Sequence, residues 1–437
     1  MYFSPEELKQ EVRPPSEKAL DALKNGRRDE LAFWLGRMSV GAQLLCTSGV
    51  YWITRLMTKI RRDHGEDLLL ESLEEVFQSL LAFAARDFRE EREKGAASFF
   101  LTLWRTYLGG MSNLEEGDRD IRMNLSPCGL GGRVLLEGWY ESDPEHFSCS
   151  DDGTPMFCKG CQALQHAFNA LADEKVLEII PDRSKMGVCR FKFLKRANTG
   201  KRIFSDEELY RARTPDCDIA LARLRAGRME GVKELLTDQH RDWRPLHDFL
   251  GLWVTLLESA MYRRYGGEYV ADLVDRTYVP MFDSAYKLFG IMGDKDAFRS
   301  MVETWHYHQA TFQVEEEEDR FVFTLDPCGS GGRLFRGDMG EWAPRYGEEM
   351  SLMQEPHVCN FLRTAFPIYC THCGLSNVDQ FSGKPRIFVV DGHAMKDPQS
   401  PCVQYLYKKH AMDNVPSSLL EQVMCEALQP VSKEYIP

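Results

Sequence analysis

The residues best suited to chemistry in this sequence are cysteines that occur in two matching sets of motifs. A Cys-x-x-Cys motif spans Cys158–Cys161, and a second one spans Cys370–Cys373. A Pro-Cys-Gly turn precedes each motif, with Cys128 in the first and Cys328 in the second. Two thiolates at this spacing can occupy two corners of a tetrahedral metal site, and the preceding cysteine can occupy a third. Because zinc is the usual metal of such sites, we expect two zinc ions per chain.

Each of these sites needs a fourth ligand. His146 and His357 lie between the two motifs of their set, in the similar contexts Asp-Pro-Glu-His and Glu-Pro-His, and we favour them. Cys149 and Cys359 are the rival pair, and an iron–sulfur cluster that uses them is a minor alternative. A shell of four protein ligands is typical of structural zinc. The expected metal ligands are Cys128, His146, Cys158 and Cys161 in one site, and Cys328, His357, Cys370 and Cys373 in the other.

A glycine-rich turn that ends in arginine follows each Pro-Cys-Gly cysteine. In the second copy it contains Ser330 and ends at Arg333. Backbone N–H groups in such a turn can bind an anion, and an arginine can bind a carboxylate or phosphate. We therefore expect Ser330 and Arg333 to bind substrate. The alternative is that the glycines only let the chain wrap around the metal turn. The pattern is neither a Walker loop nor a dinucleotide fingerprint.

Histidines are concentrated in the helical part of the second half of the chain. Where the first half has Cys46-Thr47, the second half has His247 and Asp248, and His306 and His308 follow Trp305. Imidazole and carboxylate groups can transfer protons near neutral pH. We expect these four residues to be catalytic, although histidines at helix ends often only cap carbonyl groups. His372, inside the second Cys-x-x-Cys motif, is expected to face solvent. The expected catalytic residues are His247, Asp248, His306 and His308.

These correspondences are part of a tandem duplication. The Pro-Cys-Gly motif recurs after 200 residues and the Cys-x-x-Cys motif after 212, and Cys189 corresponds to Cys402. Upstream, an offset of 201 relates Trp52 to Trp253 and Trp104 to Trp305. We therefore predict two homologous modules, at 1–200 and 215–437.

Each module is predicted to begin with helices and to continue with a small mixed part that binds metal. Apolar residues recur at three- and four-residue spacing in the helical parts, 15–115 and 217–310, and short β-type runs follow in the metal parts, 120–195 and 320–410. The arrangement indicates an α+β fold. The predicted helices are 19–35, 42–61, 68–88, 97–108, 162–171, 219–236, 246–264, 270–288 and 295–308, with an extra C-terminal helix at 417–428. The predicted strands are 121–125, 176–180, 188–194, 321–325, 386–390 and 403–407.

Composition restricts the class of protein. The 437 residues are 43% hydrophobic and carry a net charge of −13, which gives no global reason to bind nucleic acid. No apolar run reaches the ~18 residues of a membrane span, and the nearest approach, 249–262, contains Glu258. The odd count of thirteen cysteines and the absence of a signal-like start favour a cytoplasmic protein without a disulfide framework. The acidic run 315–319 is expected to be a solvated turn.

These observations favour a zinc-containing, duplicated enzyme that acts on a small anionic metabolite, with its active site in the second module. Hydrolase or lyase chemistry is preferred because no nucleotide or flavin fingerprint is present. The alternative is a non-catalytic protein that binds or senses a small molecule and in which both zinc sites are structural. A third hypothesis is an assembly factor that uses the module faces to hold a partner chain.

Overall fold

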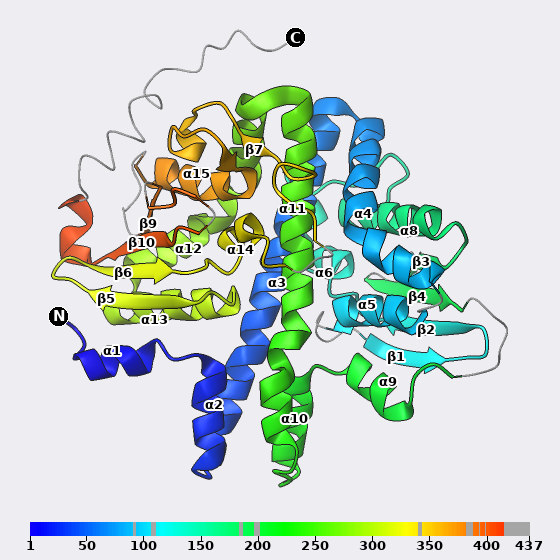
Figure 1. The fold of residues 1–437 in the computed structure, drawn as a ribbon, viewed down its shortest axis with the longest axis horizontal. Coiled ribbons are helices and arrows are strands. Elements are labelled where there is room, and N and C mark those ends of the chain that lie inside the picture. The colour runs from blue at the N-terminus through cyan, green and yellow to red at the C-terminus, as the bar shows by residue number, and fades with distance from the viewer. Residues whose placement is uncertain are drawn as a thin grey trace. The chain divides into compact units, whose positions relative to one another are not determined.

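The structure is a computed structural model, and it combines long helices with short antiparallel strands (Figure 1). This confirms the α+β class expected from the sequence. The described residues form two compact units. The first unit contains residues 13–257 and 343–344, and the second unit contains 1–12, 258–339 and 345–414. The structure describes residues 1–90, 93–105, 111–182, 187–195, 202–339, 343–381, 388–392, 394–397 and 399–414.

The two longest helices that lie wholly in the first unit, α3 and α4, are separated by a glycine. Helix α3 ends at Gly65, whose φ of 89° is a conformation that favours glycine, and α4 begins at the next residue. Gly266, the residue that corresponds to Gly65 in the second half, has a φ of 77° inside α11 and marks a kink there. The helices that begin in this unit are α2 (Pro15–Lys24), α3 (Arg28–His64), α4 (Glu66–Arg89), α5 (Glu93–Arg105), α6 (Gly131–Leu136), α7 (Trp139–Ser142), α8 (Met156–Ala172), α9 (Asp206–Arg213), α10 (Asp216–Arg225) and α11 (Val232–Thr277).

A four-stranded antiparallel sheet completes the first unit. Its strand order is β1-β2-β4-β3. Phe193 of β4 lies 6.0 Å from Phe88 of α4 and 6.4 Å from Phe100 of α5, measured between ring centroids, so this face of the sheet packs against the helices. The strands are β1 (Met111–Glu116), β2 (Asp120–Leu125), β3 (Leu177–Asp182) and β4 (Val188–Leu194).

The second unit has a sheet with the corresponding order, β5-β6-β10-β9. Its core brings together Phe298 of α13, Phe321 and Phe323 of β6, and Phe3 from the start of the chain. The helices are α1 (Pro5–Glu11), α12 (Val279–Ile291), α13 (Asp294–Tyr307), α14 (Gly331–Arg336) and α15 (Thr371–Phe381), with short 3-10 turns η1 (Val358–Asn360), η2 (Ile368–Cys370) and η3 (Lys409–Asn414). The strands are β5 (Phe312–Glu316), β6 (Arg320–Leu325), β7 (Leu352–Met353), β8 (Phe366–Pro367), β9 (Phe388–Asp391) and β10 (Cys402–Tyr407).

A buried ion pair between a lysine and a glutamate lies at the strand ends of each sheet. In the first unit, Lys195 Nζ lies 2.5 Å from Glu116 Oε1, and both side chains are at most 1% exposed. The same carboxylate accepts the backbone N–H groups of Ile203 and Phe204 at 2.6 and 3.0 Å. These contacts neutralise a charge that would be costly to bury alone. Although burial opposes it, they hold the pKa of Glu116 below its usual value.

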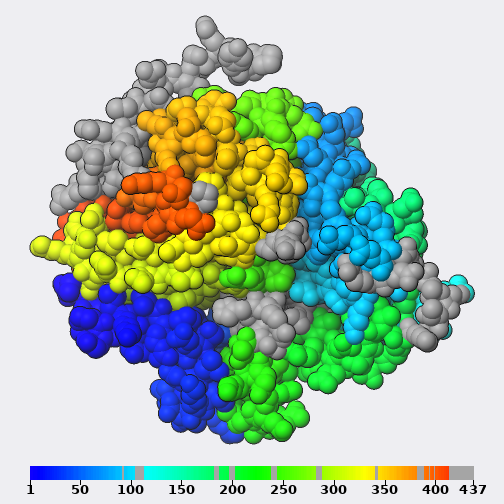
Figure 2. All heavy atoms as spheres, viewed as in Figure 1, coloured from blue at the N-terminus to red at the C-terminus, as the bar shows by residue number. Residues whose placement is uncertain are grey.

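The second unit repeats this arrangement with the first residues of the chain. Lys408 Nζ lies 2.8 Å from Glu316 Oε1, and Glu316 accepts the backbone N–H groups of Tyr2 and Phe3. Residues 1–12 therefore pack with the strands of the second half, as Figure 2 shows where the blue start of the chain meets the yellow strand region. Glu316 is 1% exposed, so the expectation of a solvated acidic turn is wrong for this residue.

Several predicted elements match the observed ones closely, among them α4, α13, β2, β4 and β6. Two predicted helices, 19–35 and 219–236, are each broken, because Gly26 and Gly227 follow the ends of α2 and α10 with φ values of 66° and 73°. The predicted helices 246–264 and most of 270–288 lie in α11 and α12. The predicted C-terminal helix 417–428 lies outside the described residues. Within the described part of the chain, no helix is long and apolar enough to cross a membrane.

Candidate functional site

Four cysteines of the first unit, Cys128, Cys158, Cys161 and Cys189, lie near one glycine turn. Cys158 and Cys161 are in the first turns of α8, at a spacing that places both on one face of the helix. Cys128 follows β2, and its backbone N–H donates to the carbonyl of Gly187 at 2.5 Å. Cys189 of β4 is paired with Leu125 at the end of β2. The strands therefore bring Cys189 to the same end of the sheet as Cys128.

The thiol groups of this set are buried and influence one another. Burial raises the pKa of the Cys161 thiol well above its usual value, and the neighbouring Cys158, Cys128 and Cys189 raise it further. Burial likewise raises the pKa of Cys158 to about 12, with added effects from Cys128 and Cys149. A Cβ atom at Gly131 would lie 2.8 Å from Cys158 Sγ. Glycine is required there because the backbone runs directly against the sulfur.

The second unit has a corresponding set. Cys370 ends η2 and Cys373 is in the first turn of α15, while Cys328 follows β6 and Cys402 is paired with Leu325 at the end of β6. Burial raises the pKa of Cys373 well above its usual value, and Cys370, Cys402 and Cys328 add to this effect. A Cβ atom at Gly331 would lie 2.5 Å from Cys370 Sγ, as close an approach as in the first unit.

The histidines expected to be ligands have other contacts in the structure. His146 Nδ1 donates to Asp143 Oδ1 at 2.8 Å, and Asp143 Oδ2 accepts from the buried Arg55 at 3.2 Å. His357 Nδ1 accepts the backbone N–H of Cys359 at 3.2 Å. Among the residues that the structure describes, no three His, Cys, Asp or Glu side chains form a group ready to hold a metal ion. The zinc sites stay a prediction.

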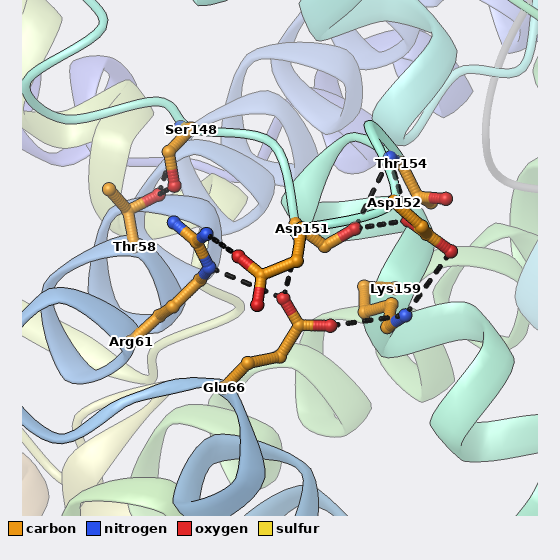
Figure 3. Close-up of polar contacts among 9 residues, drawn as sticks. Thr58, Arg61, Glu66, Ser148, Asp151, Asp152, Thr154 and Lys159 are labelled. Atoms are coloured by element: carbon orange, nitrogen blue, oxygen red, sulfur yellow. Dashed lines mark hydrogen bonds and ion pairs between the residues drawn. The ribbon is translucent and has the colours of Figure 1, made fainter.

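The loop that precedes the first Cys-x-x-Cys motif is fixed by ion pairs (Figure 3). Arg61, at the end of α3, bridges Glu66 of α4 and Asp151 of the loop at 3.3 and 2.5 Å. Lys159, between the two cysteines, lies 3.2 Å from Glu66 and 3.5 Å from Asp152. The residue inside the motif is therefore engaged in holding the loop on the helices.

A hydrogen-bonded chain of polar side chains lies beside the glycine turn of the second unit. His308, directly after α13, has its Nδ1 atom 2.8 Å from Ser330 Oγ. The Ser330 hydroxyl is also hydrogen-bonded to the Tyr369 hydroxyl, and both side chains are buried. The His308 ring packs against Trp305, with centroids 5.5 Å apart. A Cβ atom at Gly329 would lie 1.7 Å from the His308 carbonyl oxygen, so the glycine permits this approach.

Glu258 is a candidate that the sequence reasoning did not select. Its side chain in α11 is completely buried, and neither carboxylate oxygen has a hydrogen-bond partner in the described structure. Burial raises the pKa of Glu258 well above its usual value. Its charge also contributes to the raised pKa values of Tyr346, Tyr369 and Cys370. The signal in the sequence was its position as the charged residue in the apolar stretch 249–262, where Met57 corresponds to it in the first half.

The other predicted site residues are distributed between the two units. His247 and Asp248 are buried neighbours in the first unit, with Nδ1 and Oδ1 3.1 Å apart. In the second unit, His306 Nε2 donates to the Val12 carbonyl at 2.9 Å, and the buried Arg333 donates to the Asp338 carbonyl at 3.0 Å. Of the expected catalytic residues, His308 is the one that the structure pairs with the expected substrate-binding Ser330.

His372 is not the solvent-facing residue expected from the sequence. Its ring lies between those of Tyr278 and Tyr369, at centroid distances of 4.5 and 4.9 Å. Burial lowers the pKa of His372 to about 4, so the ring is neutral near neutral pH. It therefore packs as a half-buried aromatic residue beside the second pair of cysteines.

Comparison with known proteins adds no relative to this picture. No protein-family description, no curated protein and no solved structure matches the chain.

Proposed function

We propose that this chain is a tandemly duplicated, zinc-containing enzyme of the hydrolase or lyase type that acts on a small anionic metabolite, with its active site in the second half. Three correspondences support the duplication. The two sheets have the same strand order, and each holds a buried Glu–Lys pair. In addition, Thr58 Oγ1 accepts the backbone N–H of Ser148 at 3.2 Å, as Ser259 Oγ accepts that of Ser351 at 2.8 Å.

The observation that carries the enzyme proposal is the hydrogen-bonded chain of His308, Ser330 and Tyr369. A hydroxyl within hydrogen-bond distance of an imidazole is the arrangement of a nucleophile and its general base. In this proposal His308 Nδ1 takes the Ser330 proton while Oγ adds to the carbonyl carbon of an ester or amide, and Tyr369 donates a hydrogen bond to the oxygen that becomes negative. The protonated His308 then gives its proton to the leaving alcohol or amine as the bond from that group to the carbon breaks, and water hydrolyses the acyl group from Ser330. Among the two reaction types, this pair favours hydrolysis through a covalent intermediate.

The comparison between the halves supports a site confined to the second one. The residues that correspond to Ser330 and Tyr369 are Leu130 and Phe157, which have no hydroxyl group. Met57 likewise corresponds to the buried Glu258. Burying a carboxyl group without a partner costs several kcal/mol in apolar surroundings. Retention of that group in the second half fits a functional role. The apolar residues at the matching positions of the first half fit a role of that half as scaffold.

The glycine turn supports an anionic substrate. The backbone N–H groups of Gly329–Gly332 adjoin Ser330, and consecutive amides of this kind attract negative charge. Arg333 points elsewhere, since its Nη2 atom donates to the Asp338 carbonyl and its side chain is 4% exposed. In the proposed site, therefore, the backbone of the turn rather than Arg333 meets the charge of the substrate.

A covalent probe tests the proposal directly. Treatment of the purified protein with a small fluorophosphonate should add one phosphonyl group to Ser330, which intact-mass and peptide-mass spectrometry would detect. S330A should lose the label and H308Q should slow the labelling, while both keep the melting temperature of the wild type. Ser205, a hydrogen-bonded helix cap in the first unit, is a matched control, so S205A should label normally. Unlabelled Ser330 together with no turnover of small carboxylate esters, amides or lactones would contradict the proposal.

A non-catalytic binding protein is the second candidate function. Burial of both Ser330 and Tyr369 favours it, because a buried hydroxyl pair can serve recognition as well as reaction. A small carboxylate that raises the melting temperature of the wild type but not of S330A, without turnover, would favour this candidate.

A further inference from the structure

We propose that each unit binds one zinc ion through four cysteine thiolates, and that a strand cysteine rather than a histidine is the fourth ligand. This inference deepens the proposed zinc content and does not depend on the catalytic role of Ser330. The proposed ligands are Cys128, Cys158, Cys161 and Cys189 in the first unit, and Cys328, Cys370, Cys373 and Cys402 in the second.

Strand pairing places the fourth cysteine. In the first unit, Cys189 lies opposite Leu125, and the chain leaves β2 at that point to reach Cys128 three residues later. The N–H of Cys128 then donates to Gly187, two residues before Cys189 on the neighbouring strand. The two cysteines are therefore held at the same end of two hydrogen-bonded strands, as two ligands of one site must be.

The second unit repeats this placement. Cys402 lies opposite Leu325, three residues before Cys328. The Gln404 side-chain amide also donates to Cys402 Sγ at 3.4 Å. Donors of this kind to a ligating sulfur are typical of the outer shell of metal sites, where they orient the ligand. Because the same placement recurs in both units, it is a consistent property of the fold.

The glycine turn links the strand cysteines to the Cys-x-x-Cys pair. In the first unit, Gly131 lies against Cys158 Sγ and Gly132 against Cys128 Cβ, where added Cβ atoms would meet at 2.8 and 2.9 Å. Gly331 and Gly332 of the second unit lie against Cys370 and Cys328 in the same way. Both Cys-x-x-Cys motifs are also near the start of a helix, where the helix dipole favours a thiolate.

The charges fit a divalent cation. Strand pairing and the glycine turn bring the cysteines of each set together, and four neighbouring thiolates would repel one another. A dication offsets that repulsion, and binding of one Zn²⁺ by four thiols releases four protons and leaves a net charge of −2. The described residues contain no preformed metal group, so the four thiols have to close around the ion to bonds of about 2.3 Å when it binds.

The expected histidine ligands are engaged elsewhere. His146 donates to Asp143, which also pairs with Arg55, and His357 accepts the backbone N–H of Cys359 as the cap of η1. The two assignments of the fourth ligand therefore predict opposite effects on zinc content when the strand cysteines are replaced and when the histidines are replaced.

Metal content of the full-length protein, expressed with added zinc, decides between them. The wild type should contain two zinc ions per chain by native mass spectrometry and elemental analysis. C189S and C402S should each lose one ion and the double variant both, while H146Q and H357Q keep two. Loss of zinc from H146Q or H357Q with retention in C189S and C402S would overturn the assignment, as would a wild type without zinc or with an iron–sulfur cluster.

Cobalt substitution of the wild type keeps the proposal testable if the serine variants do not fold. Thiolate-to-cobalt charge-transfer absorption grows with the number of thiolate ligands. Each bound Co²⁺ should therefore show the absorption intensity expected for four thiolate ligands. An intensity of three would overturn the four-cysteine assignment. S330A should retain both metal ions, and a failure of the enzyme proposal would therefore leave this result unaffected.

Discussion

His308 Nδ1 lies 2.8 Å from Ser330 Oγ, where the end of a helix meets a glycine turn. The contact depends on Gly329, which has no side chain to separate the turn from the His308 carbonyl. Two residues 22 positions apart in the sequence are thus brought to hydrogen-bond distance by a backbone approach that only glycine allows.

Replacement of the imidazole should affect the reaction and not the fold. We expect H308Q to lower kcat by about 10²–10⁴-fold, the usual contribution of a general base. The melting temperature should change little, because His308 is only half-buried. Steady-state kinetics on a substrate found by screening carboxylate esters, together with thermal unfolding, would measure both. Unchanged kcat in H308Q would remove His308 from the mechanism.

Substitution of Gly329 should separate the two residues. A Cβ atom there would lie 1.7 Å from the His308 carbonyl oxygen, so G329A must displace the turn or the end of α13. We expect lower thermal stability and slower fluorophosphonate labelling. G251A is the matched control, because nothing lies within 4 Å of the added Cβ in α11, and alanine is the better helix former there by up to about 1 kcal/mol. Equal melting temperatures for the two variants would contradict the prediction.

Glu258 should reduce stability at neutral pH. Replacement by the residue of the first half, in E258M, removes a buried carboxyl group without a partner, and we expect the free energy of unfolding to rise by about 1–4 kcal/mol. Urea unfolding would measure this change. The reciprocal variant, M57E, buries a carboxyl group at a completely buried position and should be destabilised. A less stable E258M would show that Glu258 has partners in solution.

The effect of Glu258 should also depend on pH. Its pKa is raised by burial above the usual value of 4.5, so the folded state binds more protons than the unfolded state above that pH. The wild type should therefore lose stability relative to E258Q as the pH rises from about 4.5, until the folded-state pKa is passed. Unfolding curves of both proteins across about pH 4 to 8 would test this. Parallel curves would contradict the raised pKa.

The buried pair of Lys408 and Glu316 should be strongly coupled. K408M leaves a buried carboxylate without its cation, which costs about 3–5 kcal/mol, whereas the double variant K408M/E316Q should lose less than the single variant. R299Q is a control at a more exposed ion pair with Glu11, worth about 1 kcal/mol or less. Chemical denaturation of K408M, E316Q, the double variant and R299Q would give the four values, and a loss in the double variant equal to the sum of the losses in K408M and E316Q would show no coupling.

The sequence by itself determined the local elements and the set of reactive groups. Apolar spacing predicted α4 and α13, and short β-type runs predicted β2, β4 and β6, because such patterns reflect the local burial of a single element. The recurring Cys-x-x-Cys and Pro-Cys-Gly motifs, and the placement of polar residues such as Ser330 and His308 in the second half, were also readable from the residues alone.

Only the tertiary structure decided which of these groups meet. Glu316 belongs to an acidic run that looks solvated, yet it is buried because Lys408 and the first residues of the chain converge on it. Glu258 is the charged residue of the apolar stretch 249–262, and its burial follows only from the packing around α11. Strand pairing likewise brings Cys402 to Leu325, 77 positions away in the sequence. Local periodicity records burial along one element, whereas burial and partners of a charge depend on contacts between distant segments, which no local pattern encodes.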